Sequence, residues 1–329
     1  MAIKINYSNK VNSKSSSNLV LFTDEKLSIE SLKRYLSSQE FSYISDLQKT
    51  IDLKKNLFVF ELSSKKKIVL ISIKKDLESF DIENLGSEFY ERINYGKNSE
   101  YFVNSDSIIG KYENFISHFL HGFKLKSYEF NKYKTKKETR LISINVLGNK
   151  NKPSIPKQLK FKALEEGIFY ARDLVSEPGN ILHPGEYAKR LNSLKKDGLK
   201  VNIYDEKKLN KLGMNALLGV GKGSVKGSYL VTMEWNGAKN NSKPLAFVGK
   251  GVTFDTGGYS LKPAKFMEDM TYDMAGSAAV VGLMKNLALR KAKINAVGVV
   301  GLVENMVSGD AQRPGDIVKS YSGKTIEVL

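Results

Sequence analysis

Charged residues stand among glycines and small apolar residues in one stretch of the chain, VGKGVTFDTGGYSLKPAKFMEDMTYDMAGSAAV, which covers residues 248–280. Four of them could take part in chemistry: Lys250, Asp255, Lys262 and Asp273. Two carboxylates that converge beyond a buried strand repel each other by several kcal/mol at low dielectric unless a proton or a cation joins them. A divalent cation satisfies this requirement, so the pattern predicts a metal site.

The two lysines are expected to have different roles at such a site. Lys250 can coordinate a metal only after it loses its proton, roughly 3 pH units below its reference pKa, which costs about 4–5 kcal/mol that coordination must offset. Lys262, in the polar segment SLKPAK, is expected to stay protonated and to face an oxygen where negative charge develops. A simpler interpretation stays open, in which Asp255 is a turn residue, Asp273 caps the following helix and both lysines face solvent.

The composition restricts the alternatives. The chain has no cysteine and three histidines, so any metal must be held by oxygen or nitrogen. The glycine-rich segment GVGKGSVKG precedes a strand, whereas a dinucleotide-binding fingerprint joins a strand to a helix, and no G-x-S-x-G nucleophile elbow occurs. Nucleotide binding and serine catalysis are therefore disfavoured.

The net charge of +17, from 52 basic and 35 acidic residues, is of the kind that suggests a polyanionic partner. The lysines are spread along the whole chain, however, and the dense runs at residues 64–67 and 132–137 are interpreted as solvated turns or strand ends. No apolar run reaches the length of a membrane span, and the first residues lack the apolar centre of a secretory signal. We therefore expect a cytoplasmic protein that does not bind a membrane.

A chain of 329 residues with 41% hydrophobic residues is long enough for two domains. The polar, proline-bearing segment NKNKPSIPK places the boundary near residue 150, which gives domains 1–150 and 151–329. In the first domain, strands are predicted at residues 56–63, 67–74 and 140–148, the first two as a hairpin or as adjacent strands, and a helix is predicted at residues 108–123.

In the second domain, strands and helices alternate. Strands are predicted at residues 199–205, 228–235, 244–252 and 294–303, and helices at residues 161–179, 184–198 and 276–291. The last two strands are continuous apolar runs, which indicates a central α/β sheet covered by helices on both faces. The charged motif follows the carboxyl end of one of these strands, where open α/β sheets bind ligands.

The central motif resembles the core of the cytosolic leucine aminopeptidase family, a group of two-metal exopeptidases. Three further segments match in order: GFKLKSYEFNKYKT, ARDLVSEPGNILHP and VENMVSGDAQRPGDIVKSYSGKTIEVL, at residues 122–135, 171–184 and 303–329. The resemblance covers the chain well from about residue 120 onward and only loosely before it. It implies an N-terminal α/β module resembling macro domains, an α/β aminopeptidase catalytic domain and assembly as a homohexamer.

The resemblance also implies the site. Lys250, Asp255 and Asp273 would be ligands of two divalent ions, Mn²⁺ or Zn²⁺, with Asp255 bridging them. Lys262 would be the catalytic lysine that polarises the scissile carbonyl or stabilises the gem-diolate. Met270 matches a position that lines the pocket for the N-terminal side chain, with ordinary packing as the alternative. The implied activity is release of leucine or other apolar residues from the N-termini of peptides.

The chain departs from the family pattern in several places. The family's second metal-binding motif, Asn-Thr-Asp-Ala-Glu-Gly-Arg, normally follows SGKTIEVL, and this sequence stops at Leu329. The resemblance therefore implies an incomplete catalytic domain that is inactive by itself. Tyr259, Thr271 and Ser277 stand where the family more often has an aliphatic residue, lysine and alanine. A rival interpretation is a basic, DNA-binding architectural protein of the same family.

Overall fold

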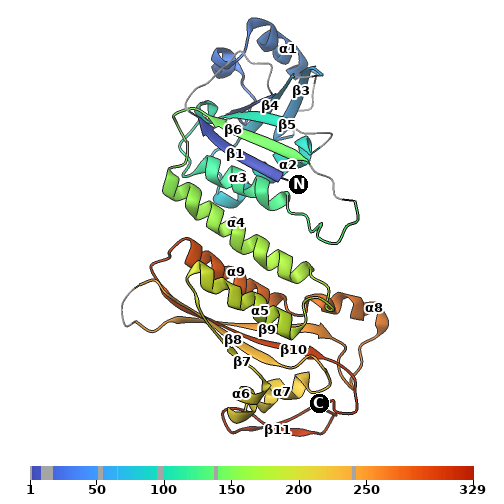
Figure 1. Cartoon of the computed structure of the whole chain (residues 1–329). Coiled ribbons are helices and arrows are strands. Elements are labelled where there is room, and N and C mark those ends of the chain that lie inside the picture. The colour runs from blue at the N-terminus through green and yellow to red at the C-terminus, as the bar shows by residue number, and fades with distance from the viewer. Residues whose placement is uncertain are drawn as a thin grey trace. The chain divides into compact units, whose positions relative to one another are not determined.

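The computed structural model of the chain describes residues 2–8, 18–50, 55–64, 66–94, 99–136, 140–238 and 242–329. The chain divides into two compact units, Met1–Phe161 and Lys162–Leu329 (Figure 1). The division falls within helix α4 (Ile155–Ser176), whereas the sequence places the boundary near residue 150. Each unit has its own sheet and its own apolar core.

The N-terminal unit is built on a six-stranded sheet in the order β1-β6-β5-β2-β4-β3. All neighbouring strands are parallel except β3 and β4, which confirms the predicted hairpin. The strands are β1 (Ala2–Ser8), β2 (Asn18–Asp24), β3 (Leu57–Ser63), β4 (Lys66–Ile73), β5 (Ser99–Asn104) and β6 (Leu141–Leu147).

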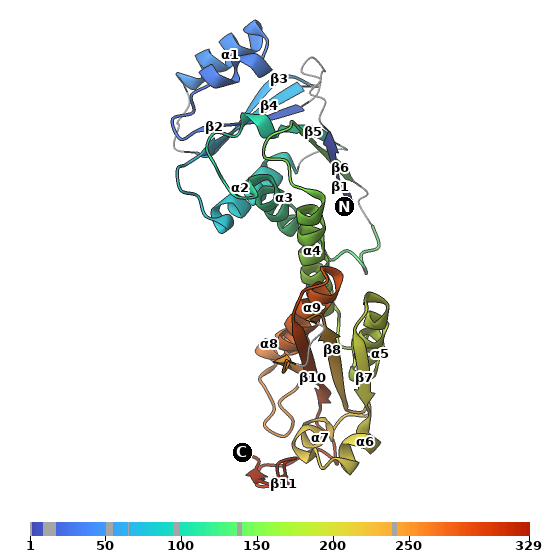
Figure 2. The ribbon, with the colours of Figure 1, turned by 90° about the vertical axis from the view of Figure 1, so that its left-hand side faces the viewer.

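Helices cover both faces of this sheet (Figure 2). On one face, α2 (Ser79–Ile93) and α3 (Phe115–Lys126) contribute aromatic side chains to the larger core. On the other face lie the 3-10 helix η1 (Glu30–Tyr35) and α1 (Ser38–Gln48). The helix predicted from residue 108 begins only at Phe115, because Gly110 and Asn114 take left-handed backbone conformations that interrupt a helix.

The two dense lysine runs, at residues 64–67 and 132–137, are predicted to be solvated turns or strand ends. In the first, Lys66 forms an ion pair with Glu40 at 2.5 Å and Lys67 forms one with Glu61 at 2.5 Å. These lysines are therefore matched by carboxylates of the same unit. Part of each run, Lys65 in the first and Lys137 in the second, lies outside the described residues.

The C-terminal unit has a four-stranded sheet in the order β7-β8-β10-β9. β9 and β10 are parallel, and the other two neighbouring pairs are antiparallel. The strands are β7 (Lys200–Tyr204), β8 (Tyr229–Asn236), β9 (Leu245–Asp255) and β10 (Asn295–Asn305), with a separate hairpin of β11 (Ile317–Lys319) and β12 (Thr325–Glu327).

Helices α5 (Pro184–Asn192) and α9 (Ala275–Leu289) pack on one face of this sheet, and α6 (Glu206–Lys211) and α7 (Asn215–Gly221) lie on the other (Figure 1). The predicted fold class, an α/β sheet covered by helices, is thus confirmed. The prediction that β9 is buried on both faces holds only for part of the strand, since Val252 and Thr253 are buried whereas Val248 is 80% exposed. β9 also lies at the edge of the four-stranded sheet. Across the described ranges, no helix is both long enough and apolar enough to span a membrane.

Candidate functional site

The candidate site begins where β9 and β10 end. Because the two strands are parallel, their carboxyl ends meet at one edge of the sheet, and Asp255 at the end of β9 lies opposite Asn305 at the end of β10. A bulge between Val303 and Asn305 sets this pairing. The chain then turns through Gly257 and Gly258, which have φ angles of +89° and +68° that glycine adopts readily.

The Asp255 carboxylate accepts hydrogen bonds on both oxygens. Its Oδ2 accepts from Lys262 Nζ at 2.5 Å, and its Oδ1 accepts from Asn305 Nδ2 at 2.7 Å and from the Gly257 backbone N–H at 2.9 Å. Burial alone would raise the pKa of Asp255, but these three donors outweigh it and hold the pKa below its usual range. The carboxylate is therefore ionised at neutral pH. The bond from Gly257 also makes Asp255 a turn residue, as the simpler interpretation predicts.

Lys262 connects Asp255 to Met270. Besides the bond to Asp255, its Nζ lies 3.1 Å from Met270 Sδ. The Lys262 side chain is 30% exposed, and its backbone N–H donates to the Thr256 carbonyl at 2.9 Å, so the turn after β9 fixes the backbone from which this side chain extends. The structure thus brings together three of the residues singled out in the sequence.

Lys250 and Asp273 form a second ion pair. Lys250 Nζ lies 2.6 Å from Asp273 Oδ1, and the side chains are 61% and 19% exposed. The predicted alternative that Asp273 caps the next helix is wrong, because the N-cap of α9 is Met274 and Asp273 bonds to Lys250. Asp273 Oδ2 is buried and has no hydrogen-bond partner among the described residues. A buried carboxylate oxygen without a donor favours a bound cation.

Two glycines of β9 allow the start of α9, which directly follows Asp273, to pack closely against the strand. A Cβ atom on Gly249 would lie 2.6 Å from Ser277 Cα, and one on Gly251 would lie 3.2 Å from Ser277 Oγ. A larger side chain at Gly249 would therefore push the start of α9 away, whereas one at Gly251 would first meet the Gly301 carbonyl oxygen of β10 at 2.5 Å. Ser277 Oγ donates to the Met274 carbonyl at 2.7 Å, and it is 3.0 Å from the Tyr187 hydroxyl.

The fit to a metal can be judged from these donors. Of the predicted ligands, Lys250 and Asp273 form an ion pair with each other, and Asp255 forms one with Lys262, the predicted catalytic lysine. Within the described ranges, no three His, Cys, Asp or Glu side chains form a metal-binding group. Two carboxylates, one of them with a buried oxygen that lacks a donor, nevertheless match the oxygen ligands that hard divalent cations prefer. The residues present therefore fit part of a divalent-metal site.

Asn305 is the residue that the sequence did not single out. A neutral amide has no charge or nucleophile that would mark it, and it stands within the matching segment that begins VENMVSGD. The pairing of β9 with β10 gives it contact with Asp255. Asn305 could have been identified only by predicting that β9 and β10 are parallel neighbours and that Asn305 lies opposite Asp255.

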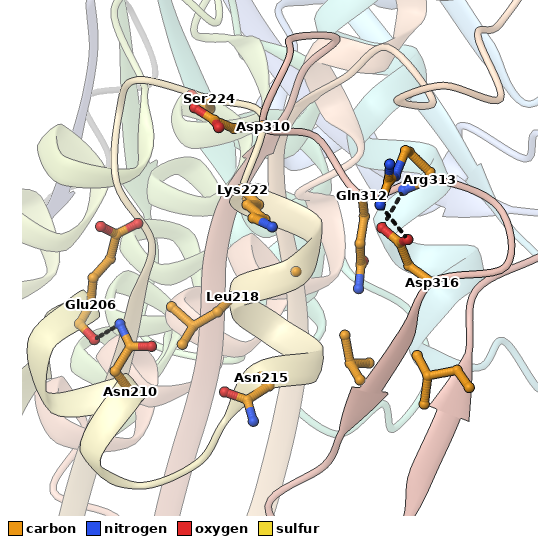
Figure 3. A pocket seen from close by; sticks show the side chains of 14 residues that line it. Glu206, Asn210, Asn215, Leu218, Lys222, Ser224, Asp310, Gln312, Arg313 and Asp316 are labelled. Atoms are coloured by element: carbon orange, nitrogen blue, oxygen red, sulfur yellow. Dashed lines mark hydrogen bonds and ion pairs between the residues drawn. The ribbon is translucent and has the colours of Figure 1, made fainter.

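A cavity of about 690 Å³ lies elsewhere in the C-terminal unit, between α6, α7 and the segment that leads into β11 (Figure 3). Its lining includes Lys222, Gln312 and Arg313, and Arg313 Nη2 bonds to Asp316 Oδ1 at 3.2 Å. Of the described residues that line it, none belongs to the two ion pairs above. The cavity is therefore not part of the predicted site.

The sequence of the C-terminal unit matches a known family. Residues 169–329 match the model of the cytosol aminopeptidase family, catalytic domain. A probable cytosol aminopeptidase of Ehrlichia ruminantium (strain Gardel) is 50% identical over 274 residues, which are 80% of this chain and 53% of that protein. One of Chelativorans sp. (strain BNC1) is 54% identical over 213 residues, which are 63% of this chain and 43% of that protein. The chain thus spans about half the length of the curated relatives that it matches.

The fold of the chain also has solved counterparts. The cytosol aminopeptidase from Coxiella burnetii superposes with a TM-score of 0.77 and 22% identity, over 98% of this chain and 65% of that one. The bottromycin maturation enzyme BotP in complex with Mn superposes with a TM-score of 0.78 and 22% identity, over 95% of this chain and 65% of that one. At this identity the likeness establishes the α/β fold alone.

Proposed function

We propose that the protein removes N-terminal residues from peptides by metal-dependent hydrolysis, with leucine and other apolar residues preferred, because residues 169–329 match the model of the cytosol aminopeptidase family, catalytic domain. The observation that carries this proposal is the arrangement at the end of β9, where Asp255 and Asp273 are each held by a lysine and one buried oxygen of Asp273 lacks a donor.

Lys250, Asp255 and Asp273 are the residues that would hold two divalent ions. These are three of the five ligand side chains that the family resemblance implies. When bound, such ions lower the pKa of a water and polarise a carbonyl oxygen. Manganese is the first metal to test, because the BotP structure contains Mn. To coordinate a metal, Lys250 must lose a proton and its ion pair with Asp273 must break. Metal binding would therefore release protons and weaken in acid.

Lys262 would act on the substrate. Its Nζ donates a hydrogen bond to the Asp255 carboxylate at 2.5 Å. In the proposed reaction it donates a hydrogen bond to the carbonyl oxygen of the scissile peptide, where negative charge develops. Met270 lies against the same Nζ atom and would contact the apolar side chain of the N-terminal residue. Both roles place the first residue of the peptide next to the turn after β9.

The test is a chimera in which residues 1–329 are continued by the remaining C-terminal segment of the Ehrlichia ruminantium relative. Release of leucine from leucine amide is measured with and without Mn²⁺. We expect turnover that requires Mn²⁺ and that falls by about 100-fold or more in Lys262→Ala, since an electrostatic donor to the oxyanion contributes roughly that much.

Lys265→Ala is the matched control. Lys265 belongs to the same segment, and its ammonium lies 5.7 Å from the Phe266 ring, with no contact to Asp255. Its substitution is expected to leave turnover unchanged. Absence of Mn²⁺-dependent turnover in the parent chimera would refute the function, and full activity of Lys262→Ala would refute the role of that lysine.

A further inference from the structure

We propose that Asn305 is a positioning residue, whose amide fixes the rotation of the Asp255 carboxylate and so presents one oxygen, Oδ2, to a metal. This inference rests on the proposed function, because it assigns Asp255 as a metal ligand. It concerns a side chain that has no charge and no coordinating role of its own.

The hydrogen bonds on Asp255 are divided unequally between its two oxygens. Oδ1 accepts from the Asn305 amide at 2.7 Å and from the Gly257 backbone at 2.9 Å, whereas the donor on Oδ2 is the Lys262 ammonium at 2.5 Å. The first two donors belong to the end of β10 and to the turn, which are fixed backbone elements. Lys262 is a flexible side chain that can move. Oδ1 is therefore the anchored oxygen, and Oδ2 is the exchangeable one.

Asn305 is itself held in place by the turn. Its carbonyl accepts from the Thr256 backbone N–H at 3.0 Å and from Thr256 Oγ1 at 2.9 Å. Its Oδ1 lies 3.2 Å from where a Cβ atom on Gly258 would stand, so the side chain packs closely against that glycine. Asn305, Thr256 and Gly257 thus form one frame around the Asp255 carboxylate, and Asn305 closes it from the neighbouring strand.

An amide is the suitable group for this position. A lysine or arginine there would bring a positive charge against a carboxylate that must attract a cation. An aspartate would add a second negative charge opposite Asp255. The Asn305 amide donates a hydrogen bond without changing the charge of the site. Removal of such outer partners of a metal ligand typically weakens metal binding by about 10–100-fold.

The experiment compares Mn²⁺ binding by the chain of residues 1–329 and its variants, measured by the electron paramagnetic resonance signal of free Mn²⁺ during titration. Asn305→Leu removes the donor and keeps the approximate volume, and Asn305→Gln keeps an amide donor. Asn202→Leu is the matched control, because the Asn202 amide also donates to a carboxylate on a neighbouring strand, that of Glu234 at 3.3 Å.

We expect the Mn²⁺ affinity to fall by about 10–100-fold in Asn305→Leu, to recover at least in part in Asn305→Gln, and to stay unchanged in Asn202→Leu. Equal affinity of Asn305→Leu and the parent would overturn the inference, as would equal weakening in Asn202→Leu or no recovery in Asn305→Gln. If the parent chain binds no Mn²⁺, the metal-ligand assignment fails and this inference fails with it.

Discussion

Ser277→Ala should lower the free energy of unfolding of the C-terminal unit by about 1–3 kcal/mol, the usual cost of a buried polar group left without its hydrogen bond. Ser277 and Tyr187 are both fully buried, and their hydroxyl oxygens are 3.0 Å apart. Burial raises the pKa of Tyr187 well above its usual range, so its hydroxyl stays neutral. In the alanine variant this hydroxyl has lost the partner that the fold provides for it.

The double variant tests this reasoning. Tyr187→Phe alone should cost about 0.5–1.5 kcal/mol, because Ser277 Oγ keeps its bond to the Met274 carbonyl at 2.7 Å. When Ser277→Ala and Tyr187→Phe are combined, no unpaired hydroxyl remains. The combined cost should therefore be smaller than the sum of the single costs by about 1 kcal/mol.

The assay is urea unfolding followed by tryptophan fluorescence. The chain has one tryptophan, Trp235, which lies in β8 and donates its indole N–H to the Ala292 carbonyl at 2.8 Å. Its fluorescence therefore reports on the C-terminal unit. Single costs that add up within about 0.5 kcal/mol in the double variant, or a stabilising Ser277→Ala, would refute the proposed coupling.

Two further predictions use the same unfolding assay. Gly249→Ala should destabilise the unit by about 1–3 kcal/mol, because its methyl group would meet the backbone of α9. Gly309→Ala is the control, and it should change the free energy of unfolding by no more than about 0.5 kcal/mol, because no described heavy atom lies within 4 Å of its added methyl group. Equal effects of the two substitutions would contradict the close approach of α9 to Gly249. A hydrogen bond from Arg190 holds the pKa of Glu186 below its usual range. The ionised Glu186 side chain therefore stabilises the folded unit above the pKa of about 4.3 that it has in the unfolded chain, and this stabilisation is lost as the pH falls through its lower pKa in the folded unit. Glu186→Gln should therefore lose less stability than the parent between pH 5 and pH 3, and identical losses would show that this pair contributes nothing.

The main strands and helices of the C-terminal unit could be predicted from the sequence. Where they end and how far they are buried could not be predicted from local patterns. The apolar run that predicts a strand at residues 244–252 appears as β9, but the strand continues to Asp255 because polar residues at its end still pair with β10. Hydrophobicity alone also predicts burial for Val248, which an edge position leaves exposed. Whether a strand has a neighbour is a property of the whole sheet.

The site residues could be named from the sequence, but their contacts could not. That Lys250 meets Asp273 depends on how closely α9 packs over Gly249, and that Lys262 meets Asp255 depends on the left-handed turn at Gly257. Both are tertiary arrangements. Asn305 shows the same limit, since an uncharged amide becomes noticeable only once the strand opposite it is known.

The edge position of β9 has a consequence for how the chain would respond to a cation. On the side away from β10, no described strand secures the backbone of β9, so its amide protons there should exchange rapidly with solvent. Lys250 and Asp255 both belong to this edge strand. Binding of an ion by these two side chains would restrain the strand, so the exchange of its outward amide protons should slow when a cation binds.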